Sequence, residues 1–232
     1  MARLARLVVA GQPHLVVQRG NNRQPVFVDA EDQTLYLDAL REVARVHSVA
    51  IHAYALLESE VRLLATPSAV DGLSKMMQAL GRRYVGAFNL RHGRTGTPWD
   101  GRFRATVIES ATWLVKCMVF IENSAVMAPS SGGATTRSSA PHHLARLVDP
   151  LVWEHEAYWS LGNTPFEREA AYKLLLENGL GGDESAAIAA ASVKGWPLGS
   201  DSYIGGLAQG TPRRLVPLKR GRRPKSVQSD PN

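Results

Sequence analysis

The spacing of apolar residues in the first 128 positions alternates between the short runs of strands and the three- to four-residue repeat of helices. Apolar runs predict strands at 14–18, 51–57, 61–65 and 103–109. Helical spacing predicts helices at 29–47, 72–89 and 112–123, with Asp29 and Thr112 as N-caps. The resulting order, β-α-β-β-α-β-α, is that of a ferredoxin-like α+β sandwich.

The composition changes after residue 128. Residues 129–140 (PSSGGATTRSSA) are rich in Ser, Thr and Gly, which is typical of a flexible linker. Short helix candidates follow at 150–161, 164–179 and 183–193, and then a segment broken by Gly and Pro at 195–210. We therefore expect a core domain at 1–128, a linker at 129–140, a helical C-terminal region at 141–210 and a basic, disordered tail at 211–232.

The positive charge is concentrated in the tail. Residues 211–232 hold seven Lys or Arg and one Asp, and this net of +6 equals the net charge of the whole chain, so the rest is neutral. The run KRGRRPK at 219–225 resembles an AT-hook, in which an Arg-Gly-Arg element lies in the minor groove of AT-rich duplex DNA. A second basic excess at 71–104 also favours a polyanionic partner. The AT-hook-like residues are Arg220, Gly221, Arg222 and Arg223.

The sequence shows no signal for a membrane or an oxidising compartment. No apolar run reaches the ~18 residues that cross a bilayer, and the apolar run near the start is shorter than a signal-peptide core. The lone Cys117 permits neither an internal disulfide nor a cysteine-based zinc site. We therefore expect a cytoplasmic protein without membrane contact.

Segments along nearly the whole chain resemble one family in order and spacing. On these segments the chain resembles the REP-associated tyrosine transposases, relatives of the insertion-sequence-200-like single-strand transposases of the HUH type. The resemblance implies the ferredoxin-like fold. The matching segments are 14–40, HAYALL at 52–57, MMQALGRRYVGAFNLRHGRTGTPWDGRF at 76–103, VFIENSAVMA at 119–128, 148–175, GWPLGSDSYIGGL at 195–207 and KRGRRPK.

The resemblance also implies a chemistry whose residues have changed. Family members cut single-stranded DNA with a tyrosine hydroxyl while two histidines on one strand face hold a divalent metal. The resemblance places the two histidines at Glu60 and Arg62 and the tyrosine at Phe120. An arginine beside a glutamate repels a cation and can pair with the carboxylate instead, and Phe120 has no hydroxyl. We therefore expect a degenerate active site with no bound metal.

Other residues could replace the missing groups, and each has a structural alternative. Tyr84 is the fallback nucleophile, although its spacing from Leu80 and Phe88 favours a core aromatic. For His52 and Tyr54 we favour a structural pair within a strand. We expect solvated or helix-surface positions for His142, His143, His155 and Glu122.

Candidate DNA contacts are more numerous than candidate catalytic groups. The turn residues Arg19, Asn21, Asn22 and Arg23 offer donors for phosphate or base edges, with an ordinary polar turn as the alternative. Basic residues interleaved with aromatic ones predict a groove for single-stranded DNA, with a core position as the alternative for Trp99. These residues are Arg82, Arg83, Arg91, His92, Arg94, Trp99, Arg102, Phe103 and Arg104.

These observations predict a transposase-family DNA-binding protein that recognises hairpin-forming or repetitive DNA without a cofactor. One alternative is an active single-strand endonuclease that uses Mg²⁺ or Mn²⁺ at an atypical site. Another is a non-catalytic partner that forms a homodimer or pairs with an intact relative.

Overall fold

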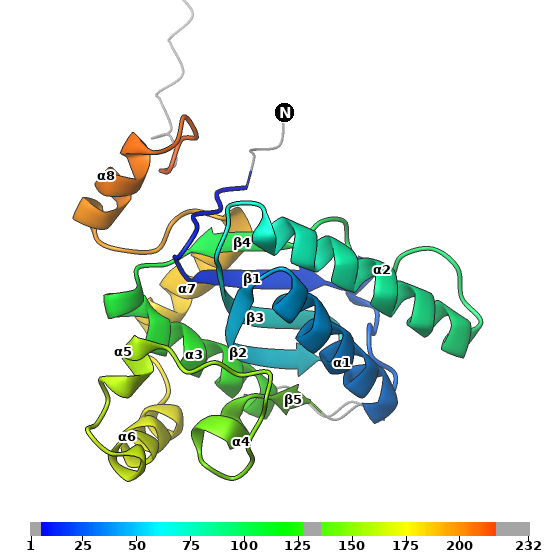
Figure 1. Cartoon of the computed structure of the whole chain (residues 1–232), viewed down its shortest axis with the longest axis horizontal. Coiled ribbons are helices and arrows are strands. Elements are labelled where there is room, and N and C mark those ends of the chain that lie inside the picture. The colour runs from blue at the N-terminus through cyan, green and yellow to red at the C-terminus, as the bar shows by residue number, and fades with distance from the viewer. Residues whose placement is uncertain (1–5, 128–135, 217–232) are drawn as a thin grey trace, which may run out of the picture.

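The computed structural model describes residues 6–127 and 136–216. Within them, a five-stranded antiparallel sheet has the strand order β4-β1-β3-β2-β5 (Figure 1). The first four strands and their helices follow the predicted ferredoxin-like order, which confirms the fold class. These elements are β1 (His14–Arg19), α1 (Ala30–Val46), β2 (Val49–Leu57), β3 (Glu60–Pro67), α2 (Gly72–His92), β4 (Arg104–Val107), α3 (Ser110–Met127) and β5 (Arg137–Ser138).

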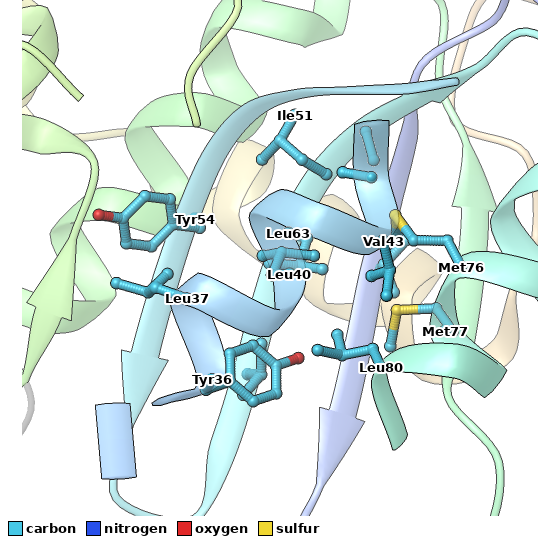
Figure 2. Packing of buried hydrophobic residues seen from close by; sticks show 14 of the residues in the cluster. Tyr36, Leu37, Leu40, Val43, Ile51, Tyr54, Leu63, Met76, Met77 and Leu80 are labelled. Carbon is cyan, nitrogen blue, oxygen red and sulfur yellow. The ribbon is translucent and has the colours of Figure 1, made fainter. Parts of the chain in front are cut away.

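The sheet separates two hydrophobic layers. Helices α1 and α2 cover one face, whereas α3 and the helices between residues 156 and 194 cover the other (Figure 1). Neighbouring residues of β3 alternate between the layers, with Leu63 in the first and Leu64 in the second. Figure 2 shows the first layer, where residues of α1 and α2 pack over the sheet: Leu37, Leu40, Val43, Met76, Met77 and Leu80 over Ile51, Tyr54 and Leu63.

Local sequence explains the start of α1 and the hairpin. The Asp29 carboxylate accepts a hydrogen bond from the Asp32 backbone N–H at 2.9 Å, which confirms the predicted N-cap. In the hairpin, Leu57 pairs with Glu60, so the turn contains only two residues and β3 begins one residue earlier than predicted. Glu60 is therefore part of the sheet.

Several predicted boundaries differ from the structure. α3 begins at Ser110, two residues before the predicted cap Thr112, and the strand predicted at 103–109 is shortened to β4. The linker predicted at 129–140 is wrong in its last residues, because Arg137–Ser138 pairs with β2 and Ser139 is buried. An edge strand of two residues has too little sequence to produce a recognisable pattern. The remainder of that linker lies outside the described residues.

The C-terminal region is helical, as predicted, but its helices differ in detail. Only 156–159 of the helix predicted at 150–161 is helical, because the Trp153 N–H donates to the Ile51 carbonyl at 2.7 Å and Val152 forms an isolated bridge with Ile51, so that this segment lies against β2. A helix forms within 195–210, where a broken segment was predicted, and Ser200 caps it. The elements are α4 (Ala140–His143), α5 (Glu156–Trp159), α6 (Pro165–Asn178), α7 (Gly182–Lys194) and α8 (Asp201–Gln209).

The helices of the described ranges are not of the membrane-spanning kind, since none is both long and apolar enough to cross a bilayer. Of the basic tail, only residues 211–216 lie within the described part of the chain. The AT-hook-like residues Arg220, Gly221, Arg222 and Arg223 lie outside it, and so the prediction for them stays a prediction.

Candidate nucleic-acid interface

Glu60 and Arg62 lie on one face of β3, as their two-residue spacing requires. The Glu60 carboxylate accepts a hydrogen bond from Arg62 Nε at 2.6 Å and another from Arg19 Nε on the neighbouring strand β1. The exposed fractions of the Glu60 and Arg62 side chains are 13% and 19%. One carboxylate is thus held between two permanently charged guanidinium groups.

Phe120 of α3 lies next to this ion-pair cluster. The Cζ atom of Arg62 is 4.8 Å from the centre of the Phe120 ring, within the range of a cation–π interaction. The structure therefore brings together all three positions that the sequence singled out for a lost active site, namely Glu60, Arg62 and Phe120. It joins them through the guanidinium of Arg62.

These residues do not fit a divalent metal ion. The Glu60 oxygens are both engaged by guanidinium donors, and the positive charge of Arg62 and Arg19 opposes a second cation at the same place. In residues 6–127 and 136–216, no group of three or more His, Cys, Asp or Glu side chains is arranged to hold a metal.

A groove of about 540 Å³ opens beside Arg62 and Phe120. It lies between α3, the end of α6 and the start of α7, and most of its lining is apolar or uncharged. Its size is within the usual range of small-ligand sites. The lining residues are Leu57, Arg62, Val119, Phe120, Asn123, Ser124, Met127, Asn178, Gly179, Leu180 and Ser185.

The glycine turn after β1 is joined to the loop after α2. The Asn21 N–H donates to the Pro98 carbonyl at 2.8 Å, and the Asp100 N–H donates to the Arg19 carbonyl at 2.8 Å. Gly20 is required at this junction, because a Cβ there would lie 2.2 Å from the Gln24 carbonyl oxygen. The two loops in which the sequence predicted DNA contacts are therefore neighbours.

The polar residues of this turn are accessible. Arg19, Asn21, Asn22 and Arg23 are exposed, and the backbone of Asn22 and Arg23 has φ values of 52° and 57° in the left-handed region. Arg23 forms no ion pair with the carboxylates of the described ranges. Its guanidinium can therefore bind an external anion without breaking an internal pair.

The other predicted basic residues do not form one continuous groove. Arg83 pairs with Glu42, and Arg91 pairs with three acidic residues at the start of α1, among them Glu31 at 2.7 Å. Arg83 and Arg91 are thus occupied by carboxylates of α1, and His92 Nε2 lies 3.0 Å from Asp32. Of the basic residues predicted to line the groove, Arg82, Arg94, Arg102 and Arg104 form no ion pair within the described part of the chain. The first three are exposed, and Arg104 donates to the Val193 carbonyl.

The stacking role predicted for Trp99 is wrong, and its alternative as a core residue is confirmed. Trp99 is only 5% exposed and packs against the rings of Tyr36 and Tyr84 at centroid distances of 6.3 and 6.0 Å. Phe103 is also buried. Loop position alone did not distinguish an aromatic side chain that closes the core from one that faces solvent.

Tyr84 does not fit the role of a fallback nucleophile. Its side chain is 1% exposed, and its hydroxyl donates to the carbonyl of Val26. Burial raises the pKa of Tyr84 well above its usual value. Moreover, Tyr84 belongs to the layer under α1 and α2, on the face of the sheet opposite to Phe120.

Glu122 of α3 is fully buried, which contradicts its predicted helix-surface position. Its carboxylate accepts hydrogen bonds from Ser139 Oγ at 2.6 Å, His143 Nδ1 at 2.7 Å and the Tyr172 hydroxyl at 2.7 Å. His143 is likewise buried, whereas a solvated position was predicted. The spacing of Glu122 from the apolar residues Met118 and Ala125 on the same helix face was the available signal.

This buried network fixes α3 to the C-terminal region. Ser139 precedes α4, His143 ends it, and Tyr172 lies on α6, so one carboxylate on α3 connects two separate segments. Burial, together with the nearby Glu122 carboxylate, raises the pKa of Tyr172 well above its usual value. Because Phe120 is two residues before Glu122, the network also fixes the helix that carries Phe120.

The remaining histidines and Tyr54 have structural partners. His52 Nδ1 donates to the Trp153 carbonyl at 2.7 Å, and its Nε2 accepts from the Thr66 hydroxyl at 2.8 Å. The Tyr54 hydroxyl donates to Asp149 at 2.7 Å. His142 and His155 accept hydrogen bonds from backbone N–H groups. The structural alternative for His52 and Tyr54 is therefore correct.

Comparison with known proteins adds evidence at the level of the fold. No protein-family model and no curated protein matches the sequence. A candidate transposase from Deinococcus radiodurans R1 is similar over 53% of this chain and 97% of its own, with 24% identity and a TM-score of 0.37. A REP-associated tyrosine transposase bound to a REP hairpin is similar over 68% of this chain and 93% of its own, with 16% identity. Its TM-score of 0.50 shows that the present chain has the fold of that transposase.

Proposed function

We propose that this chain is a DNA-binding member of the transposase family that recognises hairpin-forming or repetitive DNA and has lost strand cleavage. The observation that carries the proposal is the contact between Arg62 and Phe120, with Glu60 held by Arg62 and Arg19. These are the places where the sequence resemblance puts the nucleophile and the metal ligands. The fold shared with a transposase bound to a hairpin supports the same proposal.

The replaced residues explain why binding can persist without chemistry. A metal at such a site would offset the negative charge of a phosphodiester, and the guanidinium of Arg62 supplies positive charge in the same place. Phe120 offers a ring but no hydroxyl, and so it cannot form a covalent bond to phosphorus. A phosphodiester bound here would be held without a nucleophile or a metal to cut it, and the proposed activity needs no cofactor.

The surroundings of Arg62 suit an unpaired nucleotide next to a hairpin. The groove of about 540 Å³ beside Phe120 is large enough for a base with its sugar. On the other side of Glu60, Arg19 leads into the exposed donors of the glycine turn. A strand could therefore pass from the turn to the groove along Arg19 and Arg62.

The test combines binding and cleavage in one incubation. Purified full-length protein is mixed with an end-labelled DNA hairpin from beside its own gene, in the presence of Mg²⁺ or Mn²⁺, and divided between a native and a denaturing gel. We expect a shifted band on the native gel and neither cut strands nor a covalent adduct on the denaturing gel. Cut strands or an adduct would establish the active endonuclease instead, and the absence of a shift would refute DNA binding.

A pair of arginine variants locates the contact. Arg62→Gln removes the charge beside Phe120, and we expect it to weaken hairpin binding about tenfold, which corresponds to the loss of one charge-assisted hydrogen bond. Arg83→Gln is the matched control, because the pair of Arg83 and Glu42 is neutral overall, whereas Arg19 and Arg62 share one carboxylate and keep a net charge of +1. Equal affinities for the two variants would show that the Arg62 site does not contact DNA. If the unaltered protein shifts no hairpin but associates with an intact relative, the chain is a protein partner.

A further inference from the structure

Four basic residues gather at the C-terminal end of α7, away from the Arg62 site. Arg104 of β4 donates through Nη1 to the Val193 carbonyl at 2.7 Å, and Arg213 donates through Nη2 to the Gly195 carbonyl at 2.6 Å. Lys194 is the last residue of α7, and Arg214 follows Arg213. Figure 1 shows α7 beside the edge strand β4, which brings these distant parts of the sequence together.

The carbonyl groups at the helix end explain only part of this arrangement. The C-terminus of a helix carries partial negative charge and attracts cations. However, Arg104 and Arg213 each use one N–H for a helix carbonyl, and the other donors remain. Within the described ranges, none of the four cations forms an ion pair with a carboxylate, although 21 acidic residues occur in the chain.

Three N–H donors of this cluster are shielded from solvent and have no acceptor in the described part of the chain. They are Nε and Nη1 of Arg213 and Nε1 of Trp196. The centre of the Trp196 ring lies 6.0 Å from Arg213 Cζ and 5.8 Å from Arg214 Cζ. A shielded donor without an acceptor costs about 1–3 kcal/mol, and more when it is charged. The described residues therefore leave these donors unsatisfied.

We propose that Arg213, Arg214 and Trp196, with Arg104 and Lys194 beside them, bind a backbone phosphate of DNA. The proposal rests on the proposed DNA-binding function and adds a second contact to it. The side chains of the cluster offer N–H donors and no acceptor, which suits phosphate oxygens and not the mixed edges of bases. The contact is thus independent of DNA sequence.

The position of α7 connects this site to the groove beside Phe120. Ser185 near the start of α7 lines that groove. The carbonyl of Gly195, just after the end of α7, accepts the hydrogen bond from Arg213. Ten residues of α-helix span about 15 Å, which corresponds to roughly four phosphates along one strand of a duplex. One DNA molecule can therefore contact both sites.

The test is the salt dependence of DNA binding by the full-length protein. Affinity for a fluorescein-labelled hairpin is measured by anisotropy over a series of NaCl concentrations. Each phosphate contact that is lost should reduce the slope of log K against log salt by about 0.9. The variants are Arg214→Gln, which changes an exposed residue and should leave folding intact, Arg213→Gln with Arg214→Gln, and Trp196→Phe, which removes the indole N–H together with the five-membered ring and keeps an aromatic face.

The matched control is Arg146→Gln, which removes the same charge from an exposed position after α4. We expect a three- to tenfold loss of affinity and a smaller slope for the arginine variants, a smaller loss for Trp196→Phe, and values near those of the unaltered protein for the control. Slopes equal to that of the control would overturn the second site and leave the proposed function intact. No binding by the unaltered protein would refute the proposed function itself.

Discussion

The guanidinium of Arg62 lies 4.8 Å from the ring centre of Phe120 and bonds Glu60 at 2.6 Å through Nε. A single side chain thus contacts both other positions at which the sequence resemblance implies catalytic groups. The three substitutions are compatible with one another, since the arginine satisfies the glutamate and covers the phenyl ring. This mutual fit is consistent with the proposed binding role of the site.

Histidines at the two positions where the sequence resemblance implies metal ligands should create a metal site. We expect no change in the melting temperature of the unaltered protein on addition of Mn²⁺, because Glu60 is held by two guanidinium groups. In the variant Glu60→His with Arg62→His, two imidazoles on one strand face should bind Mn²⁺ and stabilise the fold by about 2.7 kcal/mol at a hundredfold excess over the dissociation constant. Thermal unfolding of the unaltered protein and of the variant, each with and without Mn²⁺, measures the two stabilisations. Equal stabilisation of the two proteins would contradict the account of Glu60.

The turn after β1 should be intolerant of any side chain at Gly20. Gly20→Ala would place Cβ 2.2 Å from the Gln24 carbonyl oxygen, and this steric overlap should cost about 2–3 kcal/mol of unfolding free energy. Gly86→Ala is the matched control, because nothing lies within 4 Å of its Cβ and it should stabilise α2 by about 0.5–1 kcal/mol. Urea denaturation compares the two. Similar effects of both substitutions would show that the turn does not need glycine.

Glu122 should be among the most sensitive positions for stability. Glu122→Leu leaves Ser139, His143 and Tyr172 without their shared acceptor in the core, and we expect a loss of about 3–5 kcal/mol. Glu177→Leu on the exposed face of α6 is the control and should change stability by less than about 0.5 kcal/mol. Chemical denaturation measures the free energy of unfolding of both variants. A small effect at Glu122 would mean that the network does not attach α3 to the C-terminal region.

The sequence was sufficient to predict those elements whose local pattern and tertiary environment agree. The cap at Asp29, the hairpin and α2 were predicted because apolar spacing, turn residues and burial all indicate the same element. Where the local sequence pattern failed, tertiary contacts determined the structure. β5 is held by its pairing with β2 and by the burial of Ser139. Neither feature can be recognised from the Ser- and Gly-rich sequence around it.

The candidate site was predicted in part for the same reason. The two-residue spacing on a strand placed Glu60 and Arg62 together, whereas residue type alone could not show which arginines were already paired. Arg91 and Arg83 meet acidic residues of α1 that are far away in sequence. The roles of Trp99 and Glu122 depended on which element packs over them, and this is a property of the whole fold.

Stability should fall as the pH is lowered through the range in which histidine titrates. Burial lowers the pKa of His14 and His52 from 6.5 to about 4, and it outweighs the hydrogen bonds from Nδ1 to the carbonyls of Gln12 and Trp153, which raise the pKa. A lowered pKa in the folded state means that the unfolded chain binds protons first as the pH falls. The stabilisation is therefore complete above pH 6.5 and is lost progressively towards pH 4, by about 3 kcal/mol for each histidine.

Denaturation curves between pH 7.5 and 4 would measure this loss. His52→Gln should lower stability at pH 7.5, because the amide replaces the ring imperfectly between Thr66 and Trp153. The same variant should lose about 3 kcal/mol less than the unaltered protein on acidification, because it has one fewer group to protonate on unfolding. Parallel pH profiles for the two proteins would show that His52 does not remain neutral in the folded state, and Nε2 would then donate to the Thr66 hydroxyl instead of accepting from it.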